Sequence, residues 1–314
     1  MNAGSLKAEI VEGEFERQED LFRKWVTRDG SSGFAAEPDR YHLYVSLACP
    51  WAHRTIIARM LKKLEGVIGM TVVDPLRDDR GWTFGDGAGN SQDPINGFKF
   101  LSEAYVATDP TYNKRITVPV LWDKRQGRIV SNSDDDILRM LNSAFDDFTD
   151  SDLDLYPEEL RPEIDAVNDL VYPNVNDGVY RTGFASSQVA YDHRVQLLFD
   201  APDQLEQRLS RRRYLVGDQL TEADWRLFPT LIRFDEVYYV HFKCNRRRIV
   251  DYANLWAYLR ELYQYEGVAE TVNFDHIKRH YYITHPDINP TQIVPVGPDM
   301  DLLEAHRREA LGDG

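Results

Sequence analysis

Cys49 stands where the chain changes from a strand pattern to a helix pattern, and it is the residue best suited to chemistry. The run from Tyr41 to Ser46 is apolar and β-prone, and the segment from Ala52 to Leu64 is predicted to be helical. Pro50 fits the first helical position, where its missing N–H is not needed. A cysteine here faces the positive end of the helix dipole and unpaired backbone N–H groups, which favour the reactive thiolate. We therefore expect Cys49 to act as a nucleophile.

The residue that follows Cys49 by three positions limits this chemistry. A dithiol oxidoreductase carries its second cysteine there, but this chain has Ala52. Cys49 can attack a sulfur atom, yet no adjacent thiol can resolve the mixed disulfide, so an external thiol is required. The other cysteine, Cys244, lacks a helix-start context; it is expected to be a small buried hydrophobe, with a reactive thiol as the alternative.

Three histidines raise further possibilities. His53 could tune the Cys49 thiolate, but its place in the first helical turn favours a side chain that faces outward. His276 and His280 are four residues apart and could share a helix face, as zinc ligands do. The residues between them lack the glutamate of a His-Glu-x-x-His motif and no third ligand is evident, so a structural or surface role is favoured and no metal is expected.

Strand and helix patterns alternate through the first half of the chain. The order is β-α-β-α-β-β-α, which predicts a parallel first part followed by an antiparallel hairpin. The predicted strands cover residues 41–46, 70–73, 116–122 and 128–131, the predicted helices 52–64, 99–107 and 135–144, and a polar loop 78–97. Pro119 lies inside a predicted strand, where it indicates either an edge position with a trans bond or a cis bond after Val118.

The second half is predicted to be helical. Apolar residues recur at helical spacing over residues 157–180, 187–211, 222–242, 252–265 and 268–281. Thr221 and Asp224 form a capping-box pattern at the start of one of these helices. Three prolines between Ile288 and Pro298 indicate an extended tail. The fold class is therefore an α/β thioredoxin-like N-terminal domain followed by an all-α C-terminal domain, the architecture of glutathione transferases.

Composition excludes several classes of partner. The net charge of −15 argues against a nucleic-acid-binding surface, and the arginine runs at 211–213 and 246–248 are expected to be solvated helix ends and loops. No apolar stretch approaches the roughly 18 residues that span a bilayer. Residues 1–20 are acidic and do not resemble a signal peptide. With only two cysteines and no disulfide framework, the expected compartment is the cytoplasm.

The chain closely resembles the glutathionyl-hydroquinone reductases, the Xi class of glutathione transferases. The resemblance extends over nearly all of the chain, and the combination of its motifs is very specific. The matching stretches are residues 41–55 around Cys-Pro-Trp-Ala, Gly81-Trp-Thr-Phe84, residues 118–123, residues 178–184, Leu220-Thr-Glu-Ala-Asp224, His241-Phe-Lys-Cys244, residues 271–277 and Asn289-Pro-Thr291.

This resemblance implies a cytoplasmic homodimer that reductively removes glutathione from glutathionyl-hydroquinones. The cysteine attacks the glutathionyl sulfur and a second glutathione, the co-substrate, resolves the mixed disulfide. It also implies an N-terminal extension at 1–40, a thioredoxin-like thiol-binding domain at 41–146, a helical domain with an aromatic substrate pocket at 156–284, and an extended tail at 285–314.

Site residues follow from the same resemblance. Cys49 matches the nucleophile, while Trp82, Arg115 and Val118 match residues that hold glutathione, Val118 through its backbone. Tyr191 and Tyr281 match tyrosines at the hydroquinone pocket, and Tyr180 is a further candidate. A phenol can hydrogen-bond a leaving phenolic oxygen and offers an aromatic face to the ring.

One departure concerns the residues that grip the γ-glutamyl end of glutathione. Where the family usually has Glu-Ser, this chain has Ser133-Asp134, followed by two more aspartates. Ser133 could take the carboxylate and Asp134 the amino group. Alternatively, the protein binds glutathione weakly or prefers another low-molecular-weight thiol, or the acidic cluster only caps its helix and ligand binding is lost. We expect catalysis to survive with reduced glutathione affinity; a non-catalytic protein that binds aromatic ligands on the same scaffold is the alternative.

Overall fold

Strand β3 (Tyr41–Val45) lies inside a four-stranded sheet in the computed structural model, which describes residues 9–311. The strand order is β4 (Gly69–Val72), β3, β7 (Val120–Asp123) and β8 (Arg128–Ser131). β3 pairs in parallel with β4 and antiparallel with β7, and β7 pairs antiparallel with β8. The predicted parallel crossover and hairpin are thus confirmed. All five residues of β3 are buried, because helices cover both faces of the sheet.

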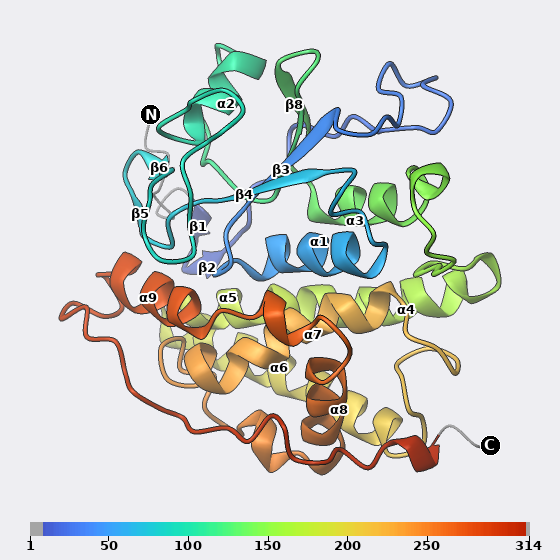
Figure 1. Ribbon diagram of the computed structural model, residues 1–314. Coiled ribbons are helices and arrows are strands. Elements are labelled where there is room, and N and C mark those ends of the chain that lie inside the picture. The colour runs from blue at the N-terminus through green and yellow to red at the C-terminus, as the bar shows by residue number, and fades with distance from the viewer. Residues whose placement is uncertain (1–8, 312–314) are drawn as a thin grey trace. The chain divides into compact units, whose positions relative to one another are not determined.

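Two helices lie side by side on one face of this sheet, α1 (Pro50–Leu61) and α3 (Asp134–Ser143). The shorter α2 (Ser102–Thr108) lies on the other face (Figure 1). The loop predicted to be polar contains the small antiparallel pair β5 (Arg77–Asp78) and β6 (Gly81–Trp82), in which β6 is buried. A single 3₁₀ turn, η2 (Asp146–Phe148), follows α3.

Helix α9 (Phe274–Thr284) belongs to the same compact unit as the sheet. The described part of this first unit comprises residues 18–154 and 271–284, and that of the second unit comprises residues 9–17, 155–270 and 285–311. The sequence places residues 274–284 in a predicted helical domain spanning 156–284, and the predicted domain boundaries stay predictions. The compact units divide the chain differently because α9 side chains contact the loop around β5 and β6.

The second unit is helical, as predicted. Its main helices are α4 (Arg161–Val171), α5 (Gly178–Gly183), α6 (Gln188–Leu209), α7 (Glu222–Arg233) and α8 (Ala253–Tyr263). Two π-helical turns, η4 (Tyr172–Asn176) and η5 (Phe234–Tyr238), follow α4 and α7 and break helices that the sequence predicts to be continuous. Pro173 explains the first break, since it has no N–H for the helical ladder.

Short elements complete the second unit. They are β1 (Ile10–Val11), β2 (Glu14–Phe15) and the 3₁₀ turns η3 (Glu158–Leu160), η6 (Ile249–Asp251), η7 (Ala269–Thr271) and η8 (Glu309–Leu311); η7 ends at the first residue of the 271–284 segment of the first unit. Residues 285–308 form no helix or strand, in agreement with the predicted extended tail.

The sequence also predicts one helix over 268–281, but the structure has two elements, η7 and α9, separated at Val272 and Asn273. The Asn273 side chain accepts a hydrogen bond from the His276 N–H at the start of α9.

The capping box at the start of α7 is confirmed. Thr221 is the N-cap, and the Asp224 carboxylate accepts a hydrogen bond of 2.8 Å from the Thr221 N–H. Its other oxygen accepts from the Tyr258 hydroxyl of α8 at 2.7 Å and from the Leu215 N–H at 3.0 Å. One buried carboxylate therefore joins a helix start, a neighbouring helix and a loop.

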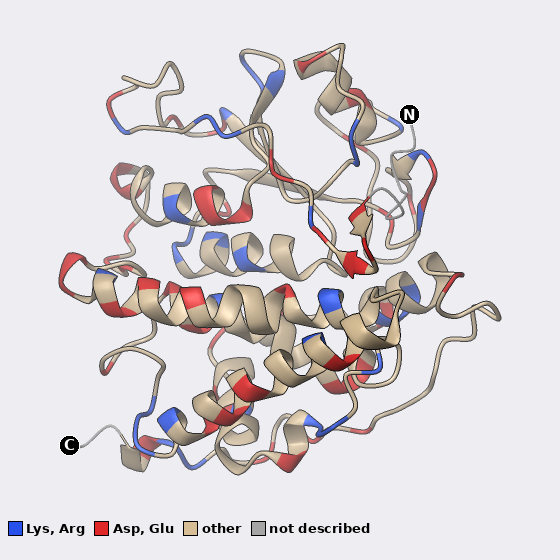
Figure 2. Ribbon diagram, turned by 180° about the vertical axis from the view of Figure 1, so that it is seen from behind, with Lys and Arg blue, Asp and Glu red and all other residues tan. Residues whose placement is uncertain are grey.

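Acidic side chains are spread over helices and loops of both units, as expected for a chain with 52 Asp and Glu against 37 Lys and Arg (Figure 2). Within the described residues, no helix combines the length and apolar character needed to cross a bilayer.

His42 is an unusual residue for the centre of a sheet. Its partner in the parallel register is Gly69, and a Cβ on Gly69 would lie 2.5 Å from the His42 Nδ1 atom, so the imidazole occupies space that only glycine leaves open. The His42 Nε2 atom is 2.7 Å from the Thr71 hydroxyl. Burial lowers the pKa of His42 to about 4.

This pKa predicts a loss of stability in acid. Between pH 6.5 and about 4 the unfolded chain binds a proton on His42 that the folded chain does not. The contribution of neutral His42 to the free energy of unfolding is therefore complete above pH 6.5 and is lost as the pH falls to about 4. A shift of this size corresponds to about 3 kcal/mol. In urea unfolding at pH 7 and at about pH 4, wild type should lose about that much more stability than His42→Gln, whose side chain does not titrate. The exposed His193→Gln variant is the control; equal losses in wild type and His42→Gln would contradict the assignment.

Candidate functional site

Cys49 is the N-cap residue of α1, as the sequence predicts, and Pro50 is the first helical residue. The Cys49 carbonyl accepts the first helical hydrogen bond, from the His53 N–H at 3.0 Å. The thiol is partly exposed, and its sulfur lies 3.5 Å from the carbonyl oxygen of Val118. A sulfur in this place is open to small molecules and lies at the positive end of the helix dipole.

The Val118–Pro119 peptide bond is cis, which decides between the two alternatives left open by the sequence. Val118 directly precedes this bond, and β7 begins at Val120. Its carbonyl accepts from the Cys49 thiol. The loop before β7 therefore places peptide backbone beside the sulfur, within the first unit.

Ser133 is the N-cap of α3, and its hydroxyl oxygen accepts from the Asp136 N–H at 3.4 Å. Asp134 begins the helix and forms a 2.6 Å ion pair with the Arg54 guanidinium, whose side chain is only 1% exposed. A second, longer contact of 3.5 Å joins Arg54 to Asp135. The positive end of the helix and the Arg54 cation thus stabilise the first two aspartates together.

The third aspartate of this run also has a cationic partner. Arg23 donates to both oxygens of Asp136, at 2.6 and 2.7 Å. Because arginines pair with all three aspartates, the mutual repulsion of these carboxylates at the helix start is largely offset. The structure thus supports a capping role for the cluster, and the Ser133 hydroxyl can still donate its hydrogen to a ligand.

Arg54 is a site residue that the sequence analysis missed. It projects from α1 toward the N-terminus of α3, and its guanidinium carbon lies 4.6 Å from the centroid of the Trp51 ring. The signal in the sequence is an arginine in the first turns of the predicted helix 52–64, close to Cys49. In the structure it is buried with all of residues 50–58. A buried arginine needs a carboxylate partner. Three aspartates, Asp134 to Asp136, stand at the start of the predicted helix 135–144.

The expectation that His53 faces outward is wrong. Its side chain is fully buried, and its Nε2 atom lies 2.7 Å from the Thr271 hydroxyl. The first turns of α1 are enclosed on all sides, so no position there reaches solvent as it would on a surface helix.

Trp82, in β6, is 3% exposed, and its ring is stacked on that of His280 with 5.0 Å between centroids. Its indole nitrogen is buried without a hydrogen-bond partner among the residues that the structure describes. An indole N–H can only donate, so such a group is ready to donate to an acceptor on a ligand.

Arg115 lies in the loop that leads to Val118, and its backbone is held firmly. The Gln18 side chain accepts from the Arg115 N–H at 3.1 Å and donates to its carbonyl at 2.9 Å. The Tyr112 hydroxyl donates to the same carbonyl at 2.8 Å. These contacts fix the base of the Arg115 side chain, which is partly exposed.

The three candidate tyrosines divide between the units. Tyr281 lies on α9 in the first unit, the unit of Cys49, and is buried with its ring edge-on to His280. Tyr191, on α6 in the second unit, donates its hydroxyl hydrogen to the Lys243 carbonyl at 2.8 Å. Burial raises the pKa of Tyr191, so this phenol stays protonated at neutral pH.

Tyr180, on α5 in the second unit, belongs to an aromatic cluster with Phe184, Tyr238 and Phe242. The Arg17 guanidinium carbon lies 4.9 Å from the centroid of its ring, a cation–π contact. The side chain is partly exposed.

Cys244 is fully buried in the second unit, with its sulfur 3.8 Å from the Val179 carbonyl oxygen. Burial raises the pKa of this thiol well above its ordinary value. The prediction of a small buried hydrophobe is confirmed.

As for metals, no group of three or more His, Cys, Asp or Glu side chains within residues 9–311 is arranged to hold an ion.

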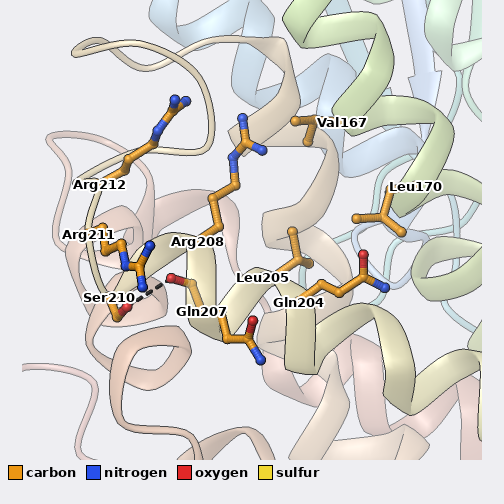
Figure 3. A pocket seen from close by; sticks show the side chains of 9 residues that line it. All are labelled: Val167, Leu170, Gln204, Leu205, Gln207, Arg208, Ser210, Arg211 and Arg212. Atoms are coloured by element: carbon orange, nitrogen blue, oxygen red, sulfur yellow. Dashed lines mark hydrogen bonds between the residues drawn. The ribbon is translucent and has the colours of Figure 1, made fainter.

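A groove of about 500 Å³ lies between α4 and the end of α6 in the second unit. Figure 3 shows its apolar and arginine side chains; the lining residues are Val167, Leu170, Gln204, Leu205, Gln207, Arg208, Ser210, Arg211 and Arg212. Arg208 and Arg212 both pair with Glu163, so this carboxylate compensates one of the positive charges that line the groove. Residues 211–213 follow Ser210, the C-cap of α6, and Arg211 and Arg212 are exposed, which agrees with the prediction of a solvated helix end.

Comparisons with known proteins agree with this architecture. The family model for the glutathione S-transferase N-terminal domain matches residues 48–144, and that for the glutathione S-transferase C-terminal domain matches residues 188–261. The chain is 52% identical to glutathionyl-hydroquinone reductase YqjG of Escherichia coli K12, with 95% of this chain and 93% of that protein covered. It is 51% identical to glutathionyl-hydroquinone reductase PcpF of Sphingobium chlorophenolicum, over 92% and 91% of the two chains.

Solved structures are similarly close. The glutathione-bound structure of E. coli YqjG superposes with a TM-score of 0.90 at 51% identity, over 95% of this chain and 98% of that one. A Xi-class glutathione transferase from Natrialba magadii gives a TM-score of 0.91 at 47% identity, with 96% of each chain covered. The chain therefore belongs to the glutathione S-transferase family, and within it to the glutathionyl-hydroquinone reductases of the Xi class.

Proposed function

We propose that this protein is a glutathionyl-hydroquinone reductase that uses Cys49 to remove glutathione from glutathionyl-hydroquinones. The observation that carries the proposal is a partly exposed thiol at the N-cap of α1 in a chain that is 52% identical to a reductase of this type over nearly its full length. The position three residues later is Ala52, so the resolving thiol must come from solution.

The reaction has two steps. The Cys49 thiolate attacks the glutathionyl sulfur, the bond from that sulfur to the aromatic carbon breaks, and the carbon takes the electron pair and a proton as the hydroquinone leaves. A second glutathione thiolate then attacks the mixed disulfide, releases oxidised glutathione and restores the Cys49 thiolate. The aromatic carbon is reduced and the two glutathione sulfurs are oxidised, so the electrons balance.

Glutathione is a small peptide, and three features of the first unit suit it. The buried indole N–H of Trp82 has no partner among the described residues and can donate to a carboxylate of the ligand. The backbone of Val118 lies beside the Cys49 sulfur, where it can pair with the cysteinyl part of the peptide. Arg115, whose backbone is fixed by Gln18, supplies a cation for a second carboxylate.

The γ-glutamyl end falls to Ser133 and Asp134 at the start of α3. We propose that the Ser133 hydroxyl and the helix N-terminus take the α-carboxylate while Asp134 attracts the amino group. Because Asp134 is already paired with Arg54, its attraction for that amino group is weakened. Reduced glutathione affinity, or the use of another low-molecular-weight thiol, follows from this pairing.

Tyr281, on the same unit as Cys49, is proposed to contact the hydroquinone, while the roles of Tyr180 and Tyr191, which belong to the second unit, stay predictions of the resemblance. A buried phenol can hydrogen-bond a phenolic oxygen and pack against the ring. The protein is further proposed to act without a metal, as a cytoplasmic homodimer. The small number of cysteines suits a reducing compartment.

The nucleophile is tested by replacing each of the two cysteines in turn. Cys49→Ala should lower turnover of a glutathionyl-hydroquinone on the order of a thousandfold or more, because the sulfur that forms the mixed disulfide is removed. Cys244→Ala, in which a buried thiol with a raised pKa is lost, is the matched control and should keep its turnover per folded molecule. Hydroquinone release is followed by liquid chromatography. Undiminished turnover in Cys49→Ala would contradict the mechanism, and absence of turnover in wild type would favour the non-catalytic alternative.

The thiol preference is tested at the start of α3. The double variant Ser133→Glu/Asp134→Ser restores the usual dipeptide and leaves Arg54 its 3.5 Å contact with Asp135. With folding checked by urea unfolding, it should bind glutathione about tenfold more tightly, a gain of about 1.4 kcal/mol. Calorimetric titration with glutathione measures this change. The same exchange at the second Ser-Asp pair of the first unit, Ser151→Glu/Asp152→Ser, is the control. An unchanged dissociation constant in the α3 variant would show that Ser133 and Asp134 are not responsible for the affinity.

A further inference from the structure

Two histidines of α9 donate to backbone carbonyls on either side of Trp82. The Nδ1 atom of His280 is 2.7 Å from the Pro75 carbonyl oxygen, before β5. The Nε2 atom of His276 is 2.7 Å from the Ala88 carbonyl oxygen, in the loop after β6. Both contacts lie within the first unit. We call His276 and His280 the α9 histidine pair.

These bonds determine where each imidazole carries its proton. A carbonyl oxygen can only accept, so the nitrogen that faces it must be the N–H donor. His280 therefore carries a hydrogen on Nδ1, and His276 carries one on Nε2. The other nitrogen of His276, Nδ1, is buried and has no hydrogen-bond partner among the described residues, which fits a lone pair there. The two side chains thus use opposite ring nitrogens for the same kind of bond.

The loop approaches α9 too closely for any residue but glycine at one point. Gly89, which follows the carbonyl bound by His276, has a φ of +82°. A Cβ there would lie 2.8 Å from His276 Nε2 and 3.2 Å from the Asn273 side-chain nitrogen. Asn273 in turn accepts from the His276 N–H at 2.9 Å. Glycine at this position leaves the room in which His276 reaches the loop.

His280 also touches Trp82 directly. The two rings are stacked at 5.0 Å with an interplanar angle of 20°, and the carbonyl bond to Pro75 fixes the orientation of the imidazole. The buried indole N–H of Trp82 is thus oriented by a ring that is itself held at its edge. A donor oriented in advance binds its acceptor at a smaller entropic cost.

From these contacts we infer that the α9 histidine pair consists of positioning residues, which hold the Pro75–Gly89 loop on α9 and so orient Trp82 for the thiol substrate. The inference rests on the proposed function, because Trp82 is a thiol-binding residue only if that function is correct. Tyr281, the next residue on α9, is the proposed hydroquinone contact in this unit. The same helix therefore supports the binding of both substrates.

Amide side chains provide a sharp test, because Asn places its NH₂ group near the position of Nδ1 and Gln near that of Nε2. His280→Asn and His276→Gln should keep the loop bonds, whereas His280→Gln and His276→Asn should lose them. Each pair removes the same imidazole, so loss of the ring cancels in the comparison. His193→Asn and His193→Gln, at an exposed position, are the controls.

Two measurements are made on each full-length variant. Calorimetric titration with glutathione should give a dissociation constant about tenfold higher in each mismatched variant than in its matched partner, the effect of one lost hydrogen bond. The turnover number at saturating glutathione should differ little within each pair. Hydrogen exchange of loop amides 76–89 should be faster in the mismatched variants.

Equal dissociation constants and equal exchange for Asn and Gln at each position would overturn the inference. Faster loop exchange without a change in glutathione affinity would also overturn it, because the bonds would then serve the loop alone. If wild type binds no glutathione at all, the proposed function fails, and the positioning role toward the thiol fails with it. If wild type binds glutathione but Cys49→Ala retains turnover, only the proposed mechanism fails, and the affinity pattern still decides the role of the histidines.

Discussion

The ion pair between Arg54 and Asp134 is the interaction on which the arrangement of the first unit depends. It joins α1 to the N-terminus of α3, and both side chains are buried. Two ions in such a place must be paired, because an isolated buried charge costs several kcal/mol. The pair therefore fixes the position of α1, which begins after Cys49, relative to the start of α3, which begins after Ser133. Two helix N-termini, each able to stabilise negative charge, are thereby held in one unit.

That ion pair also restricts ligand chemistry. A carboxylate already neutralised by arginine attracts an ammonium group less strongly than an unpaired one. The same aspartate thus strengthens the fold and weakens one contact of the γ-glutamyl group. Trp82 differs from Asp134 because its buried indole N–H has no hydrogen-bond partner among the described residues. Such a donor lowers the stability of the free protein, and a ligand that supplies an acceptor removes this cost. In the proposed thiol site, the polar group of Asp134 is therefore already paired within the protein, whereas that of Trp82 is left for the ligand.

The supports of the site come from distant parts of the sequence. Gln18 fixes the loop around Arg115, and α9 fixes the loop around Trp82 through bonds between residues 188 and 205 positions apart. In each case a side chain hydrogen-bonds to a backbone carbonyl. The position of the loop therefore does not depend on the orientation of the loop's own side chains. Such bonds allow an irregular, polar loop to present a tryptophan with a defined orientation. Cys49 itself needs no such support, because the helix start places its sulfur.

Local patterns were enough to predict much of this protein. The strand before Cys49, the proline at the first helical position, the mixed strand order, the capping box of α7 and the resemblance of the whole chain to the Xi class all follow from residue types at short spacing. What tertiary structure alone decided is which buried polar groups meet. The inward-facing His53, the partner of Arg54 and the two loop bonds of the α9 histidine pair join residues far apart in sequence. A hydrogen bond or ion pair depends on distances of a few ångströms, and no spacing along the chain encodes which distant partner comes that close.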